Sequence, residues 1–470
     1  MEENLIIVSS DSHAGMPKEL WPHYLDPQFH ELIPQLHADN AKYPVATALL
    51  AARKTGGSAS HDEHRAAHRD GWHGLHDPVL RLADMDREGV AAEMVFHGDS
   101  RLGDLFHNGT NRRYSLEAWE AGAKAWNRWA ADTFGFAPDR FLLTGAVGPC
   151  VDIDAAVAEV RWLAEHGFVA TYAPHYMTLP GLPPLFDPYW DPYWDACEEA
   201  GIALVVHAGF GTEQGVVFGV IEDIYAAAAA AAGSTDVDEL MQHASAVPSE
   251  YAQFFTTFVN RNVESRRPLW QLTLGGVFDR HPALRLLLTE IRLDWIPATL
   301  SYLDGVFDAH RDDLPTRHRP SELWHENCLA GASFMHKVET EMRHEIGVET
   351  ILFGRDYPHP ESTWPHTAEW LRDLFHGVPE DELRLMLGEN AIRFLDLDRD
   401  RLAAIAARIG PRLGDVSVSD PAVRPDLMAN FDARGGYHKP AEGDEQIPAI
   451  TPLVEADLRL VAAGARPAAS

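Results

Sequence analysis

Five short apolar runs, spread along most of the chain, each lead into a histidine, aspartate or glutamate. Residues 5–8 lead into Asp11 and His13, whose side chains would share one face of an extended backbone because they are two residues apart. An isolated Asp-x-His pair is common in surface turns and would indicate little by itself. The pattern recurs, however, at four later runs, which end at His175, His207, Glu290 and Asp356. This recurrence predicts that the ligand-type side chains gather at one end of a set of parallel strands.

The sequence between these runs alternates between short apolar stretches typical of strands and longer stretches with helical spacing. This order predicts parallel β/α architecture, and eight strands favour a (β/α)8 barrel of the α/β class. The predicted strands are residues 5–8, 90–96, 141–147, 168–173, 202–206, 284–289, 327–332 and 350–353, and the predicted helices include residues 78–89, 116–134, 153–166, 194–200 and 269–278.

One elaborated domain accounts for the length of the chain, because barrels of this class often exceed 250 residues when they carry insertions. We expect the barrel to occupy residues 1–400. A helical insertion at about residues 216–267 follows the fifth strand, and it would either roof the site or act as a packing or oligomer-contact helix. Residues 401–470 form a C-terminal extension, with a helix at 401–409, that would wrap the barrel or a partner subunit or stay mobile.

Composition excludes several classes of protein. The formal net charge of −32 lacks the basic footprint that nucleic-acid or anionic-membrane partners require. No apolar run reaches the ~18 residues of a membrane span, and the acidic start resembles no secretory signal. Three scattered cysteines form neither a disulfide framework nor a cysteine-rich zinc site. We therefore expect a cytoplasmic protein that acts on a small molecule, and we expect it to form a homo-oligomer such as a dimer.

Histidines are also frequent in the segment from 17 to 77, which we interpret mainly as loop. Most of them lack ligand spacing or a strand to fix them, so solvated side chains are the simpler interpretation. They are His23, His30, His37, His61, His64, His68, His73 and His76.

Several motifs together resemble the amidohydrolase superfamily, in the branch related to aminocarboxymuconate semialdehyde decarboxylase. They cover about residues 5–397 and are Asp11-x-His13, Val-Val-His207-Ala-Gly, Glu290 followed by Asp-Trp-Ile-Pro at 294–297, Gly-Arg-Asp-Tyr-Pro-His at 354–359 and Gly-Glu-Asn-Ala at 388–391. The resemblance implies a metal-dependent enzyme on a distorted (β/α)8 barrel. It also implies that the metal ligands come from the ends of strands one, five, six and eight.

The sequence departs from the usual pattern of that branch at three positions. Asp11 stands where His-x-His is common, Glu290 stands where many relatives have histidine, and His175 stands where asparagine is expected. The resulting set of three imidazoles and three carboxylates is larger than one zinc requires, so we expect two metal ions. The predicted ligands are Asp11, His13, His175, His207, Glu290 and Asp356.

A mixed histidine and carboxylate set also suits iron and oxygen chemistry. In this respect the chain is similar to the non-haem diiron monooxygenase type of platensimycin and platencin biosynthesis. The similarity implies two iron ions, O2 as co-substrate, an external electron donor, and hydroxylation of a bulky apolar, diterpenoid-like substrate linked to coenzyme A. We expect His97, Tyr176 and Phe210 to contact the substrate. Further loop aromatics and arginines would help hold the apolar group and the carrier phosphate, namely Trp72, Phe106, Phe186, Tyr189, Trp190, Arg112, Arg113, Arg261, Arg266 and Arg267.

The alternative is a zinc- or manganese-dependent hydrolase or non-oxidative decarboxylase, in which His359 or Asp356 would act as the acid and base. A third possibility is a barrel that has lost its metal and serves as a binding protein. The large ligand set argues against this third interpretation.

Overall fold

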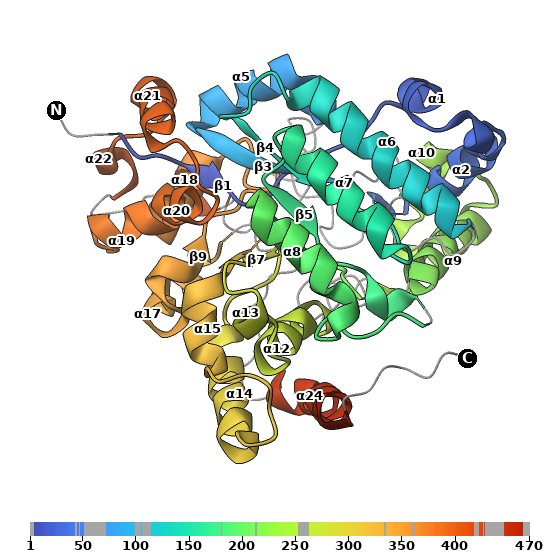
Figure 1. The fold of residues 1–470 in the computed structure, drawn as a ribbon. Helices are drawn as coiled ribbons and strands as arrows, with labels where there is room; N and C mark the ends of the chain where they lie inside the picture. The colour runs from blue at the N-terminus through green and yellow to red at the C-terminus, as the bar shows by residue number, and fades with distance from the viewer. Residues whose placement is uncertain are drawn as a thin grey trace.

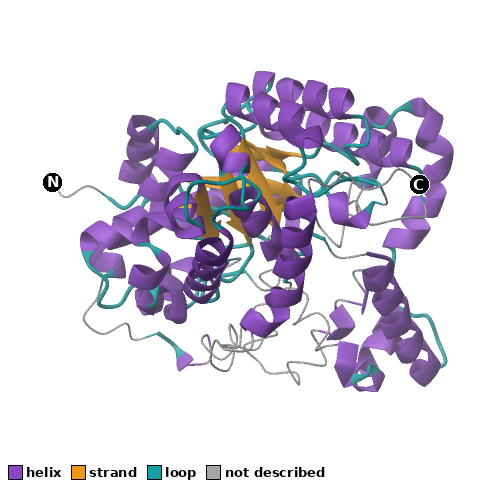
Figure 2. Ribbon diagram, turned by 60° about the horizontal axis from the view of Figure 1, so that its bottom comes forward, coloured by secondary structure: helices purple, strands orange, loops and turns teal. Residues whose placement is uncertain are grey.

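The computed structural model describes residues 4–42, 45–46, 48–50, 72–98, 105, 114–179, 181–211, 214–251, 263–332, 335–359, 362–417, 423–425, 427 and 446–463. Parallel strands form the centre of the molecule, and helices surround them (Figures 1 and 2). The strands are β1 (Val8–Ser9), β2 (His13–Ala14), β3 (Ala92–His97), β4 (Phe141–Gly145), β5 (Ala170–Tyr172), β6 (Ala203–His207), β7 (Leu286–Thr289), β8 (Cys328–Gly331) and β9 (Ile351–Leu352).

The strands follow one another around the sheet in the order β1-β3-β4-β5-β6-β7-β8-β9, and β2 extends the first position by pairing with β3. The first and last strands approach each other through a parallel bridge between Ser12 and Tyr357. Two backbone bonds reinforce this seam, from the Ser10 amide to the Phe353 carbonyl at 2.8 Å and from the His13 amide to the Tyr357 carbonyl at 2.6 Å. The result is a nearly closed eight-stranded barrel, which confirms the predicted fold class and the eight predicted strands.

Helices cover the outside of the barrel, and local sequence signals set their ends. In α5, for example, the Asp77 carboxylate accepts the Val79 and Leu80 amides, Pro78 occupies the first turn, and Gly89 ends the helix in the left-handed conformation. The α-helices are α1 (Trp21–Tyr24), α2 (Ile33–Asn40), α5 (Pro78–Glu88), α6 (Leu116–Phe134), α7 (Ile153–Glu165), α8 (Asp191–Ala200), α9 (Gln214–Ala232), α10 (Val237–Gln242), α12 (Arg267–Leu274), α13 (Val277–Arg280), α14 (Ile296–His310), α15 (Pro320–Asn327), α16 (Lys337–Glu341), α17 (Arg343–Ile346), α18 (Thr367–Leu374), α19 (Glu380–Arg384), α20 (Asn390–Phe394), α21 (Arg399–Ile409), α22 (Leu413–Val416) and α24 (Gln446–Ala463).

In the described ranges, short 3-10 helices and a π-helix connect these elements. The 3-10 helices are η1 (Lys18–Leu20), η2 (Pro27–Leu32), η3 (Trp72–Leu75), η4 (Tyr176–Thr178), η5 (Pro188–Trp190), η6 (Ala244–Ala246), η7 (Glu264–Arg266) and η8 (Val348–Thr350), and the π-helix is η9 (Leu385–Glu389).

Alternation along the strands separates two apolar layers. In β3, Ala92, Met94 and Phe96 belong to one buried cluster, whereas Val95 belongs to the larger cluster shared with the helices. Side chains at successive strand positions point to opposite faces, so the first cluster fills the barrel and the second seals the helices onto it. Glu93 alternates with the interior residues and therefore faces the helix layer.

The segment from 17 to 77 is more regular than we expected. Where it is described, it forms η1, α1, η2, α2 and η3, so the prediction that it is mainly loop is wrong there. Buried Trp21, Ile33 and Leu36 stabilise these short helices by packing into the main core. The helix starts also use prolines, such as Pro22 and Pro34, whose fixed φ suits a first turn.

Two segments outside the barrel strands pack against each other, one before α5 and one after β6. Apolar side chains from 45–50 form a separate buried cluster with residues of α9 and α10, and these helices lie close to α2 on one side of the molecule (Figure 1). The cluster comprises Ala46, Leu49, Leu50, Ile221, Ile224, Ala228, Leu240, Ala244 and Val247. The described part of the insertion after the fifth strand is therefore helical, as expected.

The C-terminal helix α24 returns to the barrel and lies beside α12 and α14 (Figure 1). Ile450 and Val454 pack against Trp270, and the Asp457 carboxylate accepts two bonds from the Arg267 guanidinium, at 2.6 and 2.8 Å. No helix in the described portion of the chain is both long enough and apolar enough to cross a membrane.

Candidate metal centre

The strand ends deliver their polar side chains to one mouth of the barrel. Asp11 lies between β1 and β2, His13 begins β2, and His207 ends β6. Glu290 directly follows β7, and Asp356 lies four residues after β9. Glu290 and Asp356 both have a φ of 52°, in the left-handed region that residues with a side chain rarely adopt. Local strain of this kind is characteristic of functional sites, where the surrounding structure holds a side chain in place.

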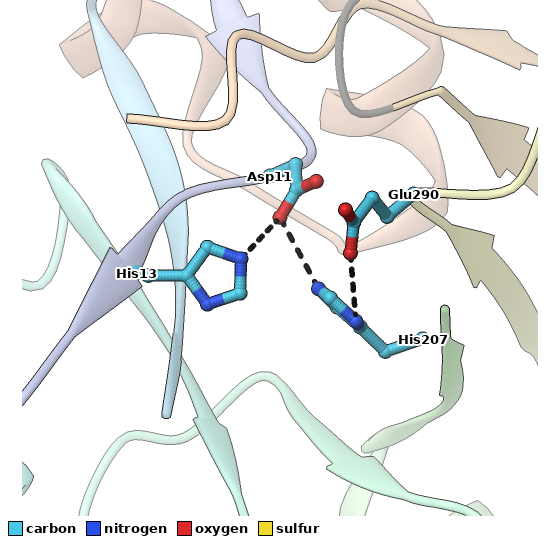
Figure 3. A group of neighbouring side chains, drawn as sticks. All are labelled: Asp11, His13, His207 and Glu290. Atoms are coloured by element: carbon cyan, nitrogen blue, oxygen red, sulfur yellow. Dashed lines mark ion pairs between the residues drawn. The ribbon is translucent and has the colours of Figure 1, made fainter. Parts of the chain in front are cut away.

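Four of these side chains face one another in Figure 3. The Asp11 Oδ1 atom lies 3.5 Å from His13 Nε2 and 3.5 Å from His207 Nε2, and the His207 Nδ1 atom lies 3.2 Å from Glu290 Oε2. Asp356 joins the group from the far side of the barrel seam, with its Oδ1 atom 3.4 Å from His13 Nε2. The structure therefore brings together five of the predicted ligands, namely Asp11, His13, His207, Glu290 and Asp356.

The donor atoms of this cluster fit a divalent metal ion. Among the described residues, both carboxylate oxygens of Asp11 and of Asp356 and the Nε2 atoms of His13 and His207 are buried without a hydrogen-bond partner. Burying such groups unpaired is costly, so a donor set that binds a cation is the simplest explanation for the arrangement. For metal–ligand distances of about 2.1 Å, ligand atoms lie about 3.0 to 3.4 Å apart, close to the separations found here. The two nitrogens and two carboxylates suit zinc or manganese.

A second cluster shares an atom with the first. His13, Asp356 and His359 also lie close enough to hold an ion, but they do so through the same His13 Nε2 atom. One nitrogen lone pair binds one metal, so the two clusters are parts of a single centre. His359 stacks on His13 with ring centroids 3.9 Å apart and places its Nδ1 atom 3.1 Å from Asp356 Oδ1.

Burial and mutual charge shift the ionisation of these groups. Burial, followed by the neighbouring Asp356, raises the pKa of Asp11. Burial, followed by His359, lowers the pKa of His13 well below its usual value, so this imidazole is neutral and able to ligate. Burial alone would lower the pKa of His207, but the Glu290 and Asp11 carboxylates outweigh it and raise this pKa to about 9.

Glu290 contacts the ring nitrogen of His207 that points away from Asp11. A carboxylate in this position accepts the Nδ1 proton, fixes the tautomer and leaves Nε2 available for a metal. This placement suits a residue that orients His207. Glu290 also belongs to the same group of possible ligands as Asp11, His13 and His207, so its role as a direct ligand stays a prediction.

His175 lies outside both clusters. Its ring packs 4.8 Å from Phe210 and 6.3 Å from Trp119, measured between ring centroids. Burial lowers the pKa of His175 to about 4, so its imidazole is neutral at physiological pH. His175 belongs to none of the groups of possible metal ligands found among the described residues, and its role as a ligand of a second metal stays a prediction.

A small cavity lies beside the centre, with room for about one water molecule. His97 and His175 line it together with aromatic residues, and the His97 ring lies 4.7 Å from that of Tyr172. Tyr176 and Phe210, the other predicted substrate contacts, are both buried. Tyr176 directly follows His175 in the chain, and the Phe210 ring packs against that of His175. The full lining is His97, Trp119, Ala146, Val147, Gly148, Tyr172, Ala173 and His175.

Several residues that we expected to hold a carrier or an apolar group have other roles. Arg267 pairs with Asp457, Arg266 stacks on Trp295 at 4.6 Å, and the Trp190 indole donates to the Pro183 carbonyl. Phe106, Arg112, Arg113, Arg261 and the side chain of Trp72 lie outside the described residues, as do His61, His64 and His68.

Sequence reasoning missed the charged residues beneath the centre. Arg81, Glu93 and Arg355 are fully buried, and both arginines donate to the Glu93 carboxylate. They lie next to β2, which carries His13, and to the segment after β9 that carries Asp356. One signal was available, because Glu93 is a single acid inside an otherwise apolar strand. A buried charge in such a position requires a partner.

Comparison with known proteins adds the family. A family model described as amidohydrolase matches residues 13–397. The gamma-resorcylate decarboxylase of Rhodococcus jostii RHA1 is 30% identical over 139 residues, which cover 27% of this chain and 39% of that protein.

Solved structures show the same fold. An amidohydrolase from Mycobacterium avium subsp. paratuberculosis K-10 matches with a TM-score of 0.56 at 18% identity, over 83% of this chain and 99% of the other. A dihydroxybenzoic acid decarboxylase from Polaromonas sp. JS666, solved with bound manganese, matches with a TM-score of 0.50 at 17% identity, over 84% and 98%.

These comparisons overturn our expected reaction. The prediction of a diiron monooxygenase that hydroxylates a carrier-linked diterpenoid is wrong, because the relatives with a named activity are decarboxylases. The physical reason for the error is that a mixed histidine and carboxylate set suits zinc, manganese and iron alike, so the set of ligand types does not select the reaction.

Proposed function

The chain belongs to the amidohydrolase family, and from this membership we propose that it is a metal-dependent, non-oxidative decarboxylase of a small hydroxylated aromatic acid. The observation that carries the proposal is the buried set of unpaired carboxylates and imidazoles at the barrel mouth. The segment shared with gamma-resorcylate decarboxylase supports the choice of reaction.

The metal would be held by Asp11, His13, His207 and Asp356, with Glu290 orienting His207. Manganese and zinc both suit this donor set, and manganese is bound by the Polaromonas relative. When bound, the cation would supply positive charge that attracts and orients the substrate carboxylate and a neighbouring hydroxyl group.

The chain's own residues would manage the proton. Decarboxylation breaks the bond between the ring carbon and the carboxyl group, leaves the electron pair on that carbon, and requires one proton there as CO2 departs. His359 lies at the barrel mouth with its Nδ1 atom 3.1 Å from Asp356, so this pair is placed to hold and deliver that proton. The step consumes neither oxidant nor reductant.

The test is CO2 release from gamma-resorcylate by protein loaded separately with Mn²⁺ or Zn²⁺. We expect turnover that requires the metal and continues under argon. Protein that binds one metal per chain but releases CO2 from neither this acid nor 5-carboxyvanillate would contradict the proposed reaction. Protein that binds neither metal would contradict the centre itself.

Metal affinity should depend strongly on pH. Without metal, the His207 ring is protonated on both nitrogens and positively charged below about pH 9, whereas ligation requires the neutral ring. Binding therefore displaces a proton, and the association constant for Mn²⁺ should rise about tenfold per pH unit between pH 7 and 9. Calorimetric titration in two buffers of different ionisation enthalpy would count the released protons. A constant affinity across this range would contradict the assignment of His207 as a ligand.

A further inference from the structure

Beneath the metal centre lies a buried group of charges that the proposed reaction does not use. The Glu93 carboxylate of β3 accepts the Arg81 Nε–H at 2.6 Å through one oxygen. Its other oxygen accepts the Arg355 Nε–H and Nη2–H groups, at 3.0 and 2.6 Å. None of the three side chains is exposed to solvent. A carboxylate thus joins two guanidinium groups that arrive from opposite sides of the barrel seam.

Each arginine continues to one side of the metal set. Arg81 donates from Nη1 to the His13 carbonyl and from Nη2 to the Ser12 hydroxyl, both at 2.6 Å. The Ser12 hydroxyl in turn donates to the Met94 carbonyl of β3. This arginine therefore fixes the backbone of β2, which carries the His13 imidazole.

Arg355 directly precedes Asp356 in the chain. Its backbone amide donates to the Ser9 hydroxyl at 3.1 Å, and that hydroxyl donates to the Asp11 carbonyl at 2.8 Å. The Asp356 amide donates to the same Asp11 carbonyl at 3.1 Å. The Arg355 side chain therefore helps to hold in place the loop that directs the Asp356 carboxylate toward the centre.

The positive and negative charges of this buried group neutralise one another within the protein. Arg355 also contacts the Glu88 carboxylate at 3.4 Å, so two carboxylates face two guanidinium groups. The Tyr357 ring covers both arginines, with its centroid 5.0 Å from the Arg81 guanidinium carbon and 4.5 Å from that of Arg355. Removing the charge of Glu93 would leave two buried cations that repel each other, and the strands they hold would move apart.

We propose that Glu93 is a positioning residue that sets the separation of His13 and Asp356 through Arg81 and Arg355, and so preorganises the metal centre. The inference rests on the metal site of the proposed function but not on the proposed reaction. Residues that hold metal ligands in place typically change metal affinity by about 10- to 100-fold when they are replaced.

The test is calorimetric titration of metal-free protein with Mn²⁺. The variant Glu93→Gln keeps the size of the side chain and an acceptor oxygen but loses the charge, and it should bind Mn²⁺ about 10- to 100-fold more weakly. Should that variant fail to fold, Arg81→Lys keeps the positive charge but loses the forked contact with His13 and Ser12. It should weaken Mn²⁺ binding in the same range.

Glu159 provides a matched control on the outer helices. It is also buried, and its carboxylate accepts bonds from Arg128 at 3.0 Å and from Asn127 at 2.7 Å. Glu159→Gln should lower the thermal stability of the protein yet bind Mn²⁺ as the native chain does.

The outcomes separate the inference from the proposed function. Native protein that binds Mn²⁺, together with a Glu93→Gln or Arg81→Lys variant that binds it within about twofold of native affinity, would overturn the inference alone. Equal weakening in Glu159→Gln would also overturn it, since the effect would then be general destabilisation. Native protein that binds no metal would overturn the metal site and the inference together.

Discussion

Replacing His207 with alanine should abolish metal binding while the barrel stays folded. The Nε2 atom of His207 faces Asp11, and the substitution removes a nitrogen ligand and leaves an open position beside two carboxylates. We expect Mn²⁺ affinity to fall at least about 1,000-fold, more than the 10- to 100-fold cost of losing a residue that merely holds a ligand in place. Catalytic activity should fall in parallel. Elemental analysis and far-ultraviolet circular dichroism would measure metal content and fold.

His281 gives a matched control for this substitution. It too is buried and lies among carboxylates, 3.2 Å from Asp191 and 3.3 Å from Glu198, but it stands before β7 rather than after a strand end. His281→Ala should therefore lose stability and keep its metal. Full metal content in His207→Ala, or equal loss in His281→Ala, would remove the basis for the proposed centre.

Replacing His359 with glutamine should slow turnover without removing the metal. General acid or base groups contribute about 10²- to 10⁴-fold to rate, and we expect a loss of kcat in that range. The metal should remain because Asp11, His13, His207 and Asp356 are unchanged. Single-turnover measurement of CO2 release with Mn²⁺-loaded protein would separate this chemical loss from weaker substrate binding.

His175→Gln is the informative comparison for His359→Gln. The His175 ring is neutral at the working pH and lies outside the metal clusters, so this variant should keep one metal per chain and lose less than about tenfold in kcat. A fall from two metals per chain to one in His175→Gln would instead restore the dinuclear centre. Unchanged kcat in His359→Gln would transfer the proton role to Asp356.

The sequence predicted the barrel well because the relevant signals are local. Each of the eight strands is an apolar run bounded by polar or turn residues, and the helix at 116–134 was placed at both ends by its apolar stripe. The structure adds the Ser115 cap, whose hydroxyl accepts the Ala118 amide. The strand-end position of Asp11, His13, His207 and Asp356 was sufficient to place them together, since the carboxyl ends of barrel strands meet at one mouth.

Other features depend on three-dimensional distances that spacing does not contain. The sequence could count six ligand-type residues, but it could not show that two clusters share the His13 Nε2 atom or that Glu290 contacts the Nδ1 side of His207. The partnership of Arg81 with Glu93 and Arg355 likewise joins segments that no local pattern relates. These contacts govern how the candidate ligands are arranged at the barrel mouth.

The barrel seam has a consequence for how the protein reaches its native state. Asp11 and Asp356 meet across the junction of β1 with β9, where the Arg355 amide bonds to Ser9 across a sequence separation of 346 residues. Closing so long a loop carries a large entropic cost and gives the native state a high contact order. An ion bound by ligands on both sides of the seam would bind only the closed barrel, and would therefore stabilise the closed barrel over states in which the seam is open. The yield of folded protein in cells should therefore depend on the metal content of the growth medium.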